Sequence, residues 1–83
     1  MPTVPHLCTI LDLVLDIHGK IIAIECKASV APQVTKGFYK AIEVLKPVKT
    51  FIVAPIETTM YPLQENIFVG SLKDVIYEIK QIL

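Results

Sequence analysis

The apolar and polar positions of this 83-residue chain fall into short segments with the periods of strands and helices. Two runs rich in branched residues, 8–17 and 20–28, predict strands. His18-Gly19 between them predicts a two-residue hairpin turn, because glycine tolerates a positive φ. Apolar runs at 49–55 and 67–70 predict two further strands, whereas 1–7 reads as an irregular arm and 56–66 as a loop.

Two segments have helical spacing. The first follows Pro32, which is placed at the start of the helix, and stops at Pro47. The second begins after Ser71, a good N-cap, with Asp74 three residues later as an approximate capping box. The apolar stripes are Val34, Phe38, Ala41, Ile42 and Leu45 in the first helix, and Leu72, Val75, Ile76, Ile79 and Leu83 in the second.

The resulting order is β-β-α-β-β-α within a single domain of residues 1–83. The strand, helix and strand between residues 20 and 55 form a parallel crossover, while the preceding hairpin is antiparallel. The pattern therefore predicts an α/β fold, with a small mixed sheet of about four strands and two helices packed on it.

The composition modifies this picture in one respect. The chain is 53% hydrophobic with a mean hydropathy of +0.58, which is more than so small a domain buries by itself. We therefore expect a homo-oligomer or a covering element from elsewhere. No apolar run approaches the roughly 20 residues of a membrane span. With no signal peptide, disulfide framework or Cys/His zinc pattern, the expectation is a reduced, cytoplasmic chain without membrane contact.

Charged residues interrupt the first two strands where burial is expected. If His18-Gly19 is the turn, Ile17 pairs with Lys20, and the same register places Asp12 opposite Glu25. Alternation then puts Asp12, Glu25 and Lys27 on one face of the hairpin. The other face is uniformly apolar and is expected to be core; its members are Leu11, Leu13, Leu15, Ile22, Ile24 and Cys26.

Opposed carboxylates repel unless something compensates for their charge. One of them holds a proton, Lys27 neutralises the pair, or a cation binds between them. Two carboxylates, a main-chain carbonyl and open positions for water suit Mg²⁺, and an adjacent lysine suits phosphodiester hydrolysis. The alternative is an ordinary solvated hairpin face, on which Asp and Glu are common. The apolar neighbours of the charges, among them Val14 and Ala23, favour the functional interpretation.

Other polar residues carry weaker signals. Lys36 and Lys40 lie one turn apart on the first helix and are weak candidates for phosphate contacts of DNA, against a solvated helix face. Asp16 and His18 read as turn residues, and Cys26 as an inert buried thiol. The absence of arginine argues against sequence-specific base reading. No hydrolase triad or Gly-rich phosphate loop is visible, so no nucleotide cofactor is expected.

The segment LDLVLDIHGKIIAIECKAS, residues 11–29, resembles the Asp…Glu-x-Lys signature of the PD-(D/E)xK nuclease superfamily. More narrowly, it resembles the nuclease-like C-terminal domain of many prokaryotic AAA-type ATPases, a domain of unknown function. There a Val-Asp-Phe strand turns at Asn-Gly into a strand ending Ile-Glu-Val-Lys-Ser. TKGFYKAIEVL, KTFIVAP and IFVGSLKDVIYEI resemble its helix, its next strand, and its closing strand and helix. The resemblance covers residues 8–83.

By this resemblance, Asp12 and Glu25 bind Mg²⁺ or Mn²⁺, the main-chain carbonyl of Cys26 is a further ligand, and Lys27 is the catalytic lysine of DNA hydrolysis. Ile10 stands where relatives often carry an acidic residue, and the superfamily's first helix has no room before the first strand. The implied fold is a truncated restriction-endonuclease-like core, and the chain then looks like the tail of a longer protein or a remnant of one. A catalytically silent module for dimerisation or for docking to a larger ATPase is the alternative.

Overall fold

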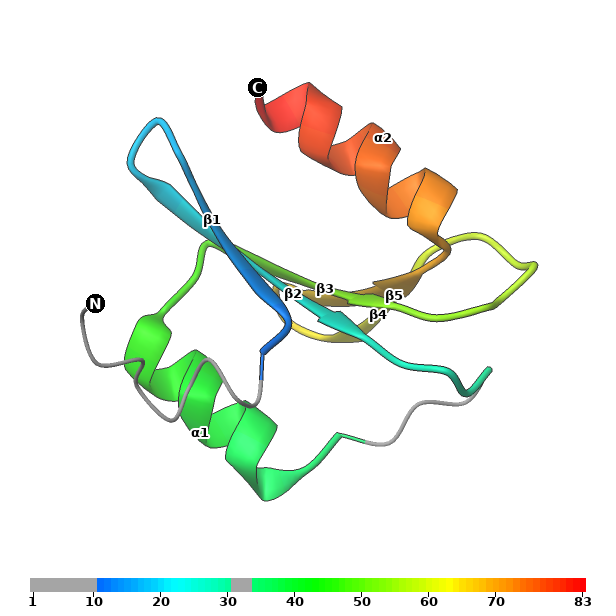
Figure 1. Ribbon diagram of the computed structural model, residues 1–83, viewed down its shortest axis with the longest axis horizontal. Coiled ribbons are helices and arrows are strands. Elements are labelled where there is room, and N and C mark those ends of the chain that lie inside the picture. The colour runs from blue at the N-terminus through cyan, green and yellow to red at the C-terminus, as the bar shows by residue number, and fades with distance from the viewer. Residues whose placement is uncertain (1–10, 31–33) are drawn as a thin grey trace.

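The computed structural model describes residues 11–30 and 34–83, which form one mixed sheet with a helix on each face (Figure 1). The sheet has five strands in the order β1-β2-β3-β5-β4. The outer pairs β1–β2 and β4–β5 are antiparallel, whereas β2–β3 and β3–β5 are parallel. The elements are β1 Leu13–Ile17, β2 Lys20–Cys26, α1 Lys36–Leu45, β3 Lys49–Val53, β4 Tyr61–Gln64, β5 Ile67–Gly70 and α2 Leu72–Ile82. The predicted α/β class and mixed sheet are confirmed.

The β1–β2 hairpin has the predicted turn and register. His18 and Gly19 both have positive φ, 54° and 81°, as a type I′ turn requires. The Asp16 carboxylate accepts a hydrogen bond of 2.9 Å from the N–H of Gly19, which holds the turn closed. Ile17 pairs with Lys20, and the pairing continues without a bulge to Leu13 opposite Ile24. The next position along this register brings Asp12 to Glu25.

Helix α1 covers one face of the sheet. Phe38 and Ala41 are buried against Ala23 and Ile52 of the central strands. The helix begins at Lys36, with the Thr35 hydroxyl accepting from the N–H of Phe38 at 3.2 Å, so the predicted start at Pro32 is wrong and Val34 precedes the helix. A threonine N-cap satisfies an unpaired N–H of the first turn, which proline does not do. Pro32 itself lies outside the described residues.

Helix α2 lies on the opposite face. The Ser71 hydroxyl accepts from the N–H of Asp74 at 3.2 Å, which confirms the predicted N-cap. Val75 is buried against Phe51 and Ile22. The rest of the predicted apolar stripe is not uniformly core. Leu72 is 61% exposed and Ile76 44% exposed, whereas Val75 and Ile79 face the sheet.

Several predicted boundaries need correction. Strand β4 lies within the predicted loop 56–66, and β1 begins only at Leu13; residues 1–10, which include the arm and the first part of that strand, lie outside the described residues. β4 is an edge strand, where Pro62 is tolerated because its missing N–H interrupts no central pairing. Within residues 11–30 and 34–83, no helix is long and apolar enough to cross a membrane.

We expect Ser71→Ala to lower the free energy of unfolding by about 1 kcal/mol, because it removes the side-chain acceptor at the start of α2. Urea unfolding followed by circular dichroism measures this change. Thr58→Ala, in the exposed loop before β4, is the matched control and should leave the midpoint unchanged. Equal midpoints for both variants would show that α2 is held by packing alone.

Candidate functional site

The site begins where the Asp12 side chain replaces a main-chain group of the sheet. Ile17 and Lys20 flank the turn as a hydrogen-bonded pair, so every second pair along the hairpin exchanges main-chain bonds. That pattern would next pair the N–H of Cys26 with the carbonyl of Leu11. The Asp12 carboxylate accepts this N–H instead, at 2.7 Å. The chain bends at Asp12 as a result, and regular pairing with β2 ends there.

This bend corrects the predicted position of Leu11. Strict alternation placed Leu11 on the face of Leu13 and Leu15, but it is 3% exposed in the cluster with Ala23 and Phe38, under α1. The bend turns the Leu11 side chain to the other side of the sheet. Leu13 remains on the predicted face but is 48% exposed rather than core.

Glu25 is a buried carboxyl group with an acidic neighbour. It lies opposite Ile52 in the centre of the sheet and is 7% exposed. Desolvation, followed by a hydrogen bond with the Asp12 carboxyl and repulsion from its charge, raises the pKa of Glu25 from 4.5 to about 7. The pKa of Asp12 is lowered, first by the Cys26 N–H and then by the hydrogen bond with Glu25. The raised pKa of Glu25 beside the lowered pKa of Asp12 favours one proton between the two carboxyls near neutral pH.

Lys27 completes the cluster. Its Nζ lies 3.7 Å from Oε2 of Glu25, two residues before it on the same side of the strand. The ammonium partly offsets the effect of Asp12 on Glu25. The structure thus brings Asp12, Glu25 and Lys27 together at the end of the hairpin, while the roles predicted for them stay predictions.

The oxygen atoms of this cluster suit a small divalent cation. In a strand, the N–H and C=O of one residue point toward the same neighbour, so the Cys26 carbonyl points to the side on which Asp12 lies. Hard carboxylate and carbonyl oxygens are the ligands that Mg²⁺ takes, often with only one or two carboxylates from the protein. Within the described part of the chain, no group of three or more His, Cys, Asp or Glu side chains is arranged to hold a metal. The available ligand set is therefore Asp12, Glu25 and the carbonyl.

The Cys26 thiol was expected in the core, but the residue is exposed. It is on the face that carries α2, next to the start of that helix, where Cys26 and Leu72 line one hollow. Partial desolvation, then the carboxylates of Asp12 and Glu25, raise the pKa of the thiol, so it is a poor nucleophile at neutral pH. The inertness that was predicted from burial is thus favoured instead by partial desolvation and by the neighbouring carboxylates.

The remaining candidates lie apart from the cluster. Asp16 serves the hairpin turn, and His18 is within that turn. Lys36 and Lys40 are exposed on α1. The sequence did not indicate the hydrogen bond from the Cys26 N–H to the Asp12 carboxylate. Its one signal was that regular apolar alternation does not extend past Asp12 toward the N-terminus.

Comparisons with known proteins add no relationship. No protein-family model matches the chain, no curated protein matches it, and no solved structure matches its fold. The functional argument accordingly depends on the chemistry of the cluster itself.

We expect Glu25→Gln to stabilise the metal-free protein at pH 8. The folded state raises the pKa of Glu25, so it binds more protons than the unfolded chain between pH 4.5 and about 7, and stability falls as pH rises through that window. At about 1.4 kcal/mol per pKa unit, the loss is at most about 3 kcal/mol. Thermal unfolding at pH 5 and pH 8, in chelator, measures it.

Glu43→Gln, an exposed glutamate of α1, is the control for loss of one negative charge and should behave like wild type. If wild type and Glu25→Gln lose equal stability between the two pH values, the carboxyl pair does not share a proton as described.

Proposed function

We propose that the chain is a nuclease-like domain of the PD-(D/E)xK type, which uses Mg²⁺ or Mn²⁺ to hydrolyse DNA phosphodiester bonds. The observation that carries this proposal is the buried Glu25 carboxyl held against Asp12 and Lys27. Two carboxyls held together in this way destabilise the fold when no cation lies between them. A role in stability therefore does not explain the arrangement, whereas a role in cation binding does.

The proposed roles follow from the positions of the atoms. The hydrogen bond from the Cys26 N–H already orders the Asp12 side chain. Its other carboxylate oxygen is therefore available to a cation at little further cost in side-chain entropy. Glu25 would be the second ligand, once its carboxyl has lost the proton that its raised pKa favours. A bound divalent ion supplies an activated water and neutralises phosphate charge. Lys27 places a positive charge beside Glu25, where it stabilises the charge that develops on the attacked phosphate.

The architecture supports the same proposal. An antiparallel hairpin carries the acids and the lysine, a helix follows, and a parallel strand returns beside the hairpin. This is the order expected for a truncated restriction-endonuclease-like core. Lys36 and Lys40 lie on the exposed side of α1, which packs on the sheet face toward which Glu25 points, and we assign them a weak role in contacting DNA phosphates.

Metal binding is tested with Asp12→Asn, which keeps an oxygen acceptor for the Cys26 N–H but removes the charge. We expect Mg²⁺ or Mn²⁺ to raise the melting temperature of wild type and to have at least about tenfold weaker affinity for the variant. Isothermal titration and thermal shift measure both. Asp16→Asn removes an acidic charge from the same hairpin and should bind like wild type. Equal metal affinity in all three proteins would contradict the site.

Cleavage is tested separately with Lys27→Met, which keeps the apolar stem of the lysine. We expect nicking of supercoiled plasmid with Mn²⁺ to fall by about 100-fold or more, with metal affinity retained, because the lysine acts on the phosphate rather than on the ion. Lys36→Met, on α1, should retain most of the activity. A Lys27→Met protein that cleaves as fast as wild type would remove the lysine from the mechanism.

A second candidate, a catalytically silent interaction module that dimerises or docks on a larger ATPase chain, is favoured by one observation. Large apolar side chains remain exposed on the α2 face of the sheet, among them Leu13, Leu72 and Ile76. Metal binding without any cleavage of single-stranded or double-stranded DNA would favour this candidate over the nuclease.

A further inference from the structure

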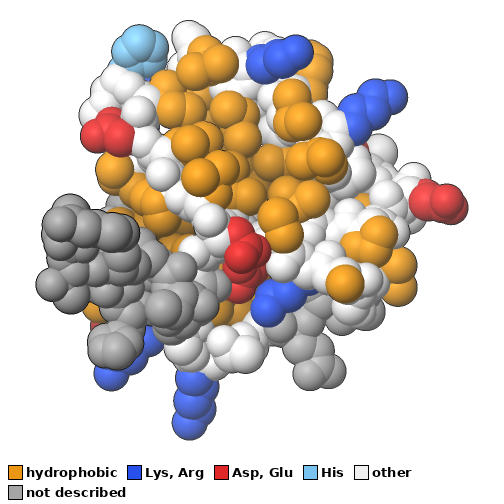
Figure 2. All heavy atoms as spheres, viewed as in Figure 1, with side chains coloured by type: hydrophobic (Ala, Val, Ile, Leu, Met, Phe, Trp, Pro, Cys, Tyr) orange, Lys and Arg blue, Asp and Glu red, His pale blue; other side chains and the backbone are white. Residues whose placement is uncertain are grey.

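The carboxyl ends of the parallel strands β2, β3 and β5 meet at one edge of the sheet. Ligands of open α/β sheets commonly bind beside such ends. The cluster of Asp12, Glu25 and Lys27 lies at this edge and is open to solvent, since Asp12 is exposed and Lys27 is partly exposed. Figure 2 shows acidic and basic side chains side by side at the border of a hydrophobic surface. A substrate that reaches the cluster therefore lies along this edge.

Two adjoining hollows extend along the same edge. The first has a volume of about 470 Å³ and is lined by Lys27 and, just after β3, by Pro55. The second has a volume of about 410 Å³ and is lined by the same Pro55 and by Tyr61, the first residue of β4. Because the hollows share Pro55, they lead from the lysine of the cluster to a tyrosine that is 36% exposed.

The strand register places Tyr61 on the face of the sheet to which Glu25 points. Glu25 pairs with Ile52, and Ile52 pairs with Val69. Val69 in turn pairs with Tyr61, and residues paired in this way point to the same face. Three steps of about 4.8 Å between strands place the Cα atoms of Glu25 and Tyr61 roughly 14 Å apart. Ile52 and Val69, which lie between them, are fully buried under α1, so a ligand that contacts both ends runs along the edge of the sheet.

The second hollow suits a nucleobase and not a phosphate. Its lining comprises one aromatic ring, three other apolar side chains, one hydroxyl and one carboxylate: Tyr61, Val30, Pro55, Ile56, Thr58 and Glu57. The exposed Glu57 carboxylate repels phosphate, whereas carboxylate and hydroxyl oxygens accept hydrogen bonds from the amino group of a base. Bases of single-stranded DNA stack on exposed aromatic rings, and every base has a face that can do so. The charge and the apolar lining therefore favour the base of a nucleotide.

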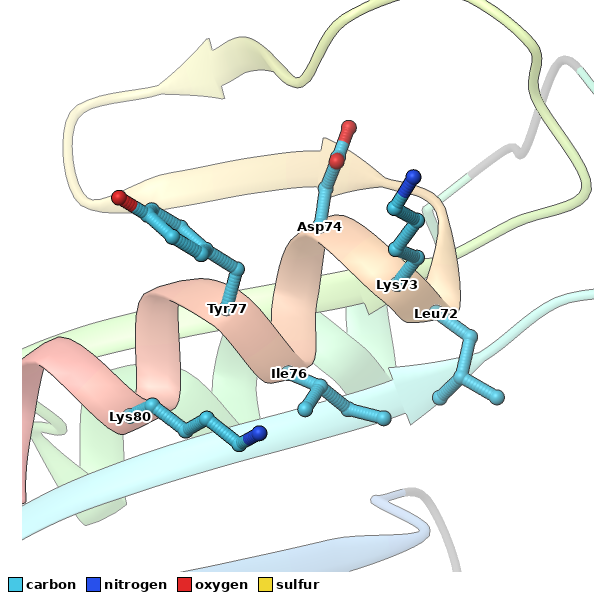
Figure 3. A pocket seen from close by; sticks show the side chains of 6 residues that line it. All are labelled: Leu72, Lys73, Asp74, Ile76, Tyr77 and Lys80. Atoms are coloured by element: carbon cyan, nitrogen blue, oxygen red, sulfur yellow. The ribbon is translucent and has the colours of Figure 1, made fainter.

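Tyr77 of α2 is a second aromatic ring on the surface. It is 61% exposed and lines a hollow together with Lys73 and Lys80 (Figure 3). Aromatic and basic side chains together also suit a nucleotide chain. Helix α2, however, covers the face of the sheet opposite to the one that Glu25 shares with Ile52, so a strand whose phosphate reaches Glu25 continues on the α1 side. Tyr77 is therefore the rival position and serves as the control.

The two ends of the depression match the two parts of a DNA strand. Lys27, with the cation proposed to bind at Asp12 and Glu25, suits a phosphate, and Tyr61 suits a base of the same strand. A base within a duplex is paired and stacked between its neighbours, so it has to leave the duplex before a side chain stacks on it.

We propose that the substrate of this domain is DNA with unpaired bases, and that Tyr61 stacks on one base of the strand whose phosphate lies at Lys27. The proposal rests on the nuclease function proposed above. It adds to that function a substrate class and a residue that recognises it.

The first test measures the affinity of the full chain for a labelled oligodeoxynucleotide of about 12 nucleotides, single-stranded and as a duplex, by fluorescence anisotropy. Chelator is present, so binding is followed without metal-dependent cleavage. We expect the single strand to bind more tightly than the duplex. Tyr61→Leu should weaken binding of the single strand at least about fivefold and leave the duplex unchanged. Tyr61→Phe, which keeps the ring, and Tyr77→Leu should bind like wild type, and circular dichroism verifies that each variant is folded.

A second measurement locates the stacked base. The base analogue 2-aminopurine, whose fluorescence is quenched by stacking, replaces one base at a time along the single strand. We expect additional quenching at one position with wild type and with Tyr61→Phe, and its loss with Tyr61→Leu.

The outcomes separate this site from the nuclease function. Equal affinities and equal quenching for wild type and Tyr61→Leu overturn the stacking site, as does a loss confined to Tyr77→Leu, and Mn²⁺-dependent nicking by wild type would leave the nuclease function intact. Tighter binding of the duplex overturns the substrate class. Tyr61-dependent stacking in a protein that cleaves no DNA would keep the site and remove the nuclease function.

Discussion

The hydrogen bond from the Cys26 N–H to the Asp12 carboxylate is the interaction on which the candidate site depends. A side chain takes the place of a main-chain carbonyl, so the strand β1 ends and the carboxyl group is fixed at the same point. The bend sends Leu11 into the core under α1, which anchors the chain on the far side of the acid. This single exchange of hydrogen-bond acceptor therefore sets where strand β1 ends, where the candidate ligand Asp12 lies and which residue enters the core under α1.

Burial of Glu25 next to this fixed acid has a cost that the rest of the fold must offset. The cost is visible in its raised pKa and arises from desolvation first and the Asp12 charge second. An 83-residue domain has a small margin of stability, so a carboxyl group in the middle of a sheet is an expensive feature. Lys27 compensates for only part of the charge, and a divalent cation would compensate for the rest. The carboxyl pair that destabilises the metal-free fold is thus also the candidate ligand pair.

The two helices cover their faces of the sheet unequally. Helix α1 buries Phe38 and Ala41 against its face, whereas on the α2 face Leu13 and Cys26, at the end of the hairpin far from the turn, stay exposed. The cluster of acids and the open apolar surface share the end of the same hairpin.

The sequence alone determined the hairpin, its register and the meeting of Asp12 with Glu25. Those features are local: a His-Gly turn fixes the pairing, and a strand period of two fixes the faces. It also determined the Ser71 cap and the parallel return to β3, since both follow from short-range patterns. The strand β4 was missed because Pro62 in an edge strand resembles a loop.

Only the tertiary structure decided which apolar residues are covered. Leu13, Leu72 and Cys26 have core-like patterns, yet their exposure depends on where α2 crosses the sheet, and no local signal specifies that position. The bend at Asp12 likewise required knowing that a side-chain oxygen outcompetes a main-chain carbonyl 14 residues away in sequence. Periodicity reports which face a residue is on, whereas burial and hydrogen-bond partners depend on contacts between distant segments.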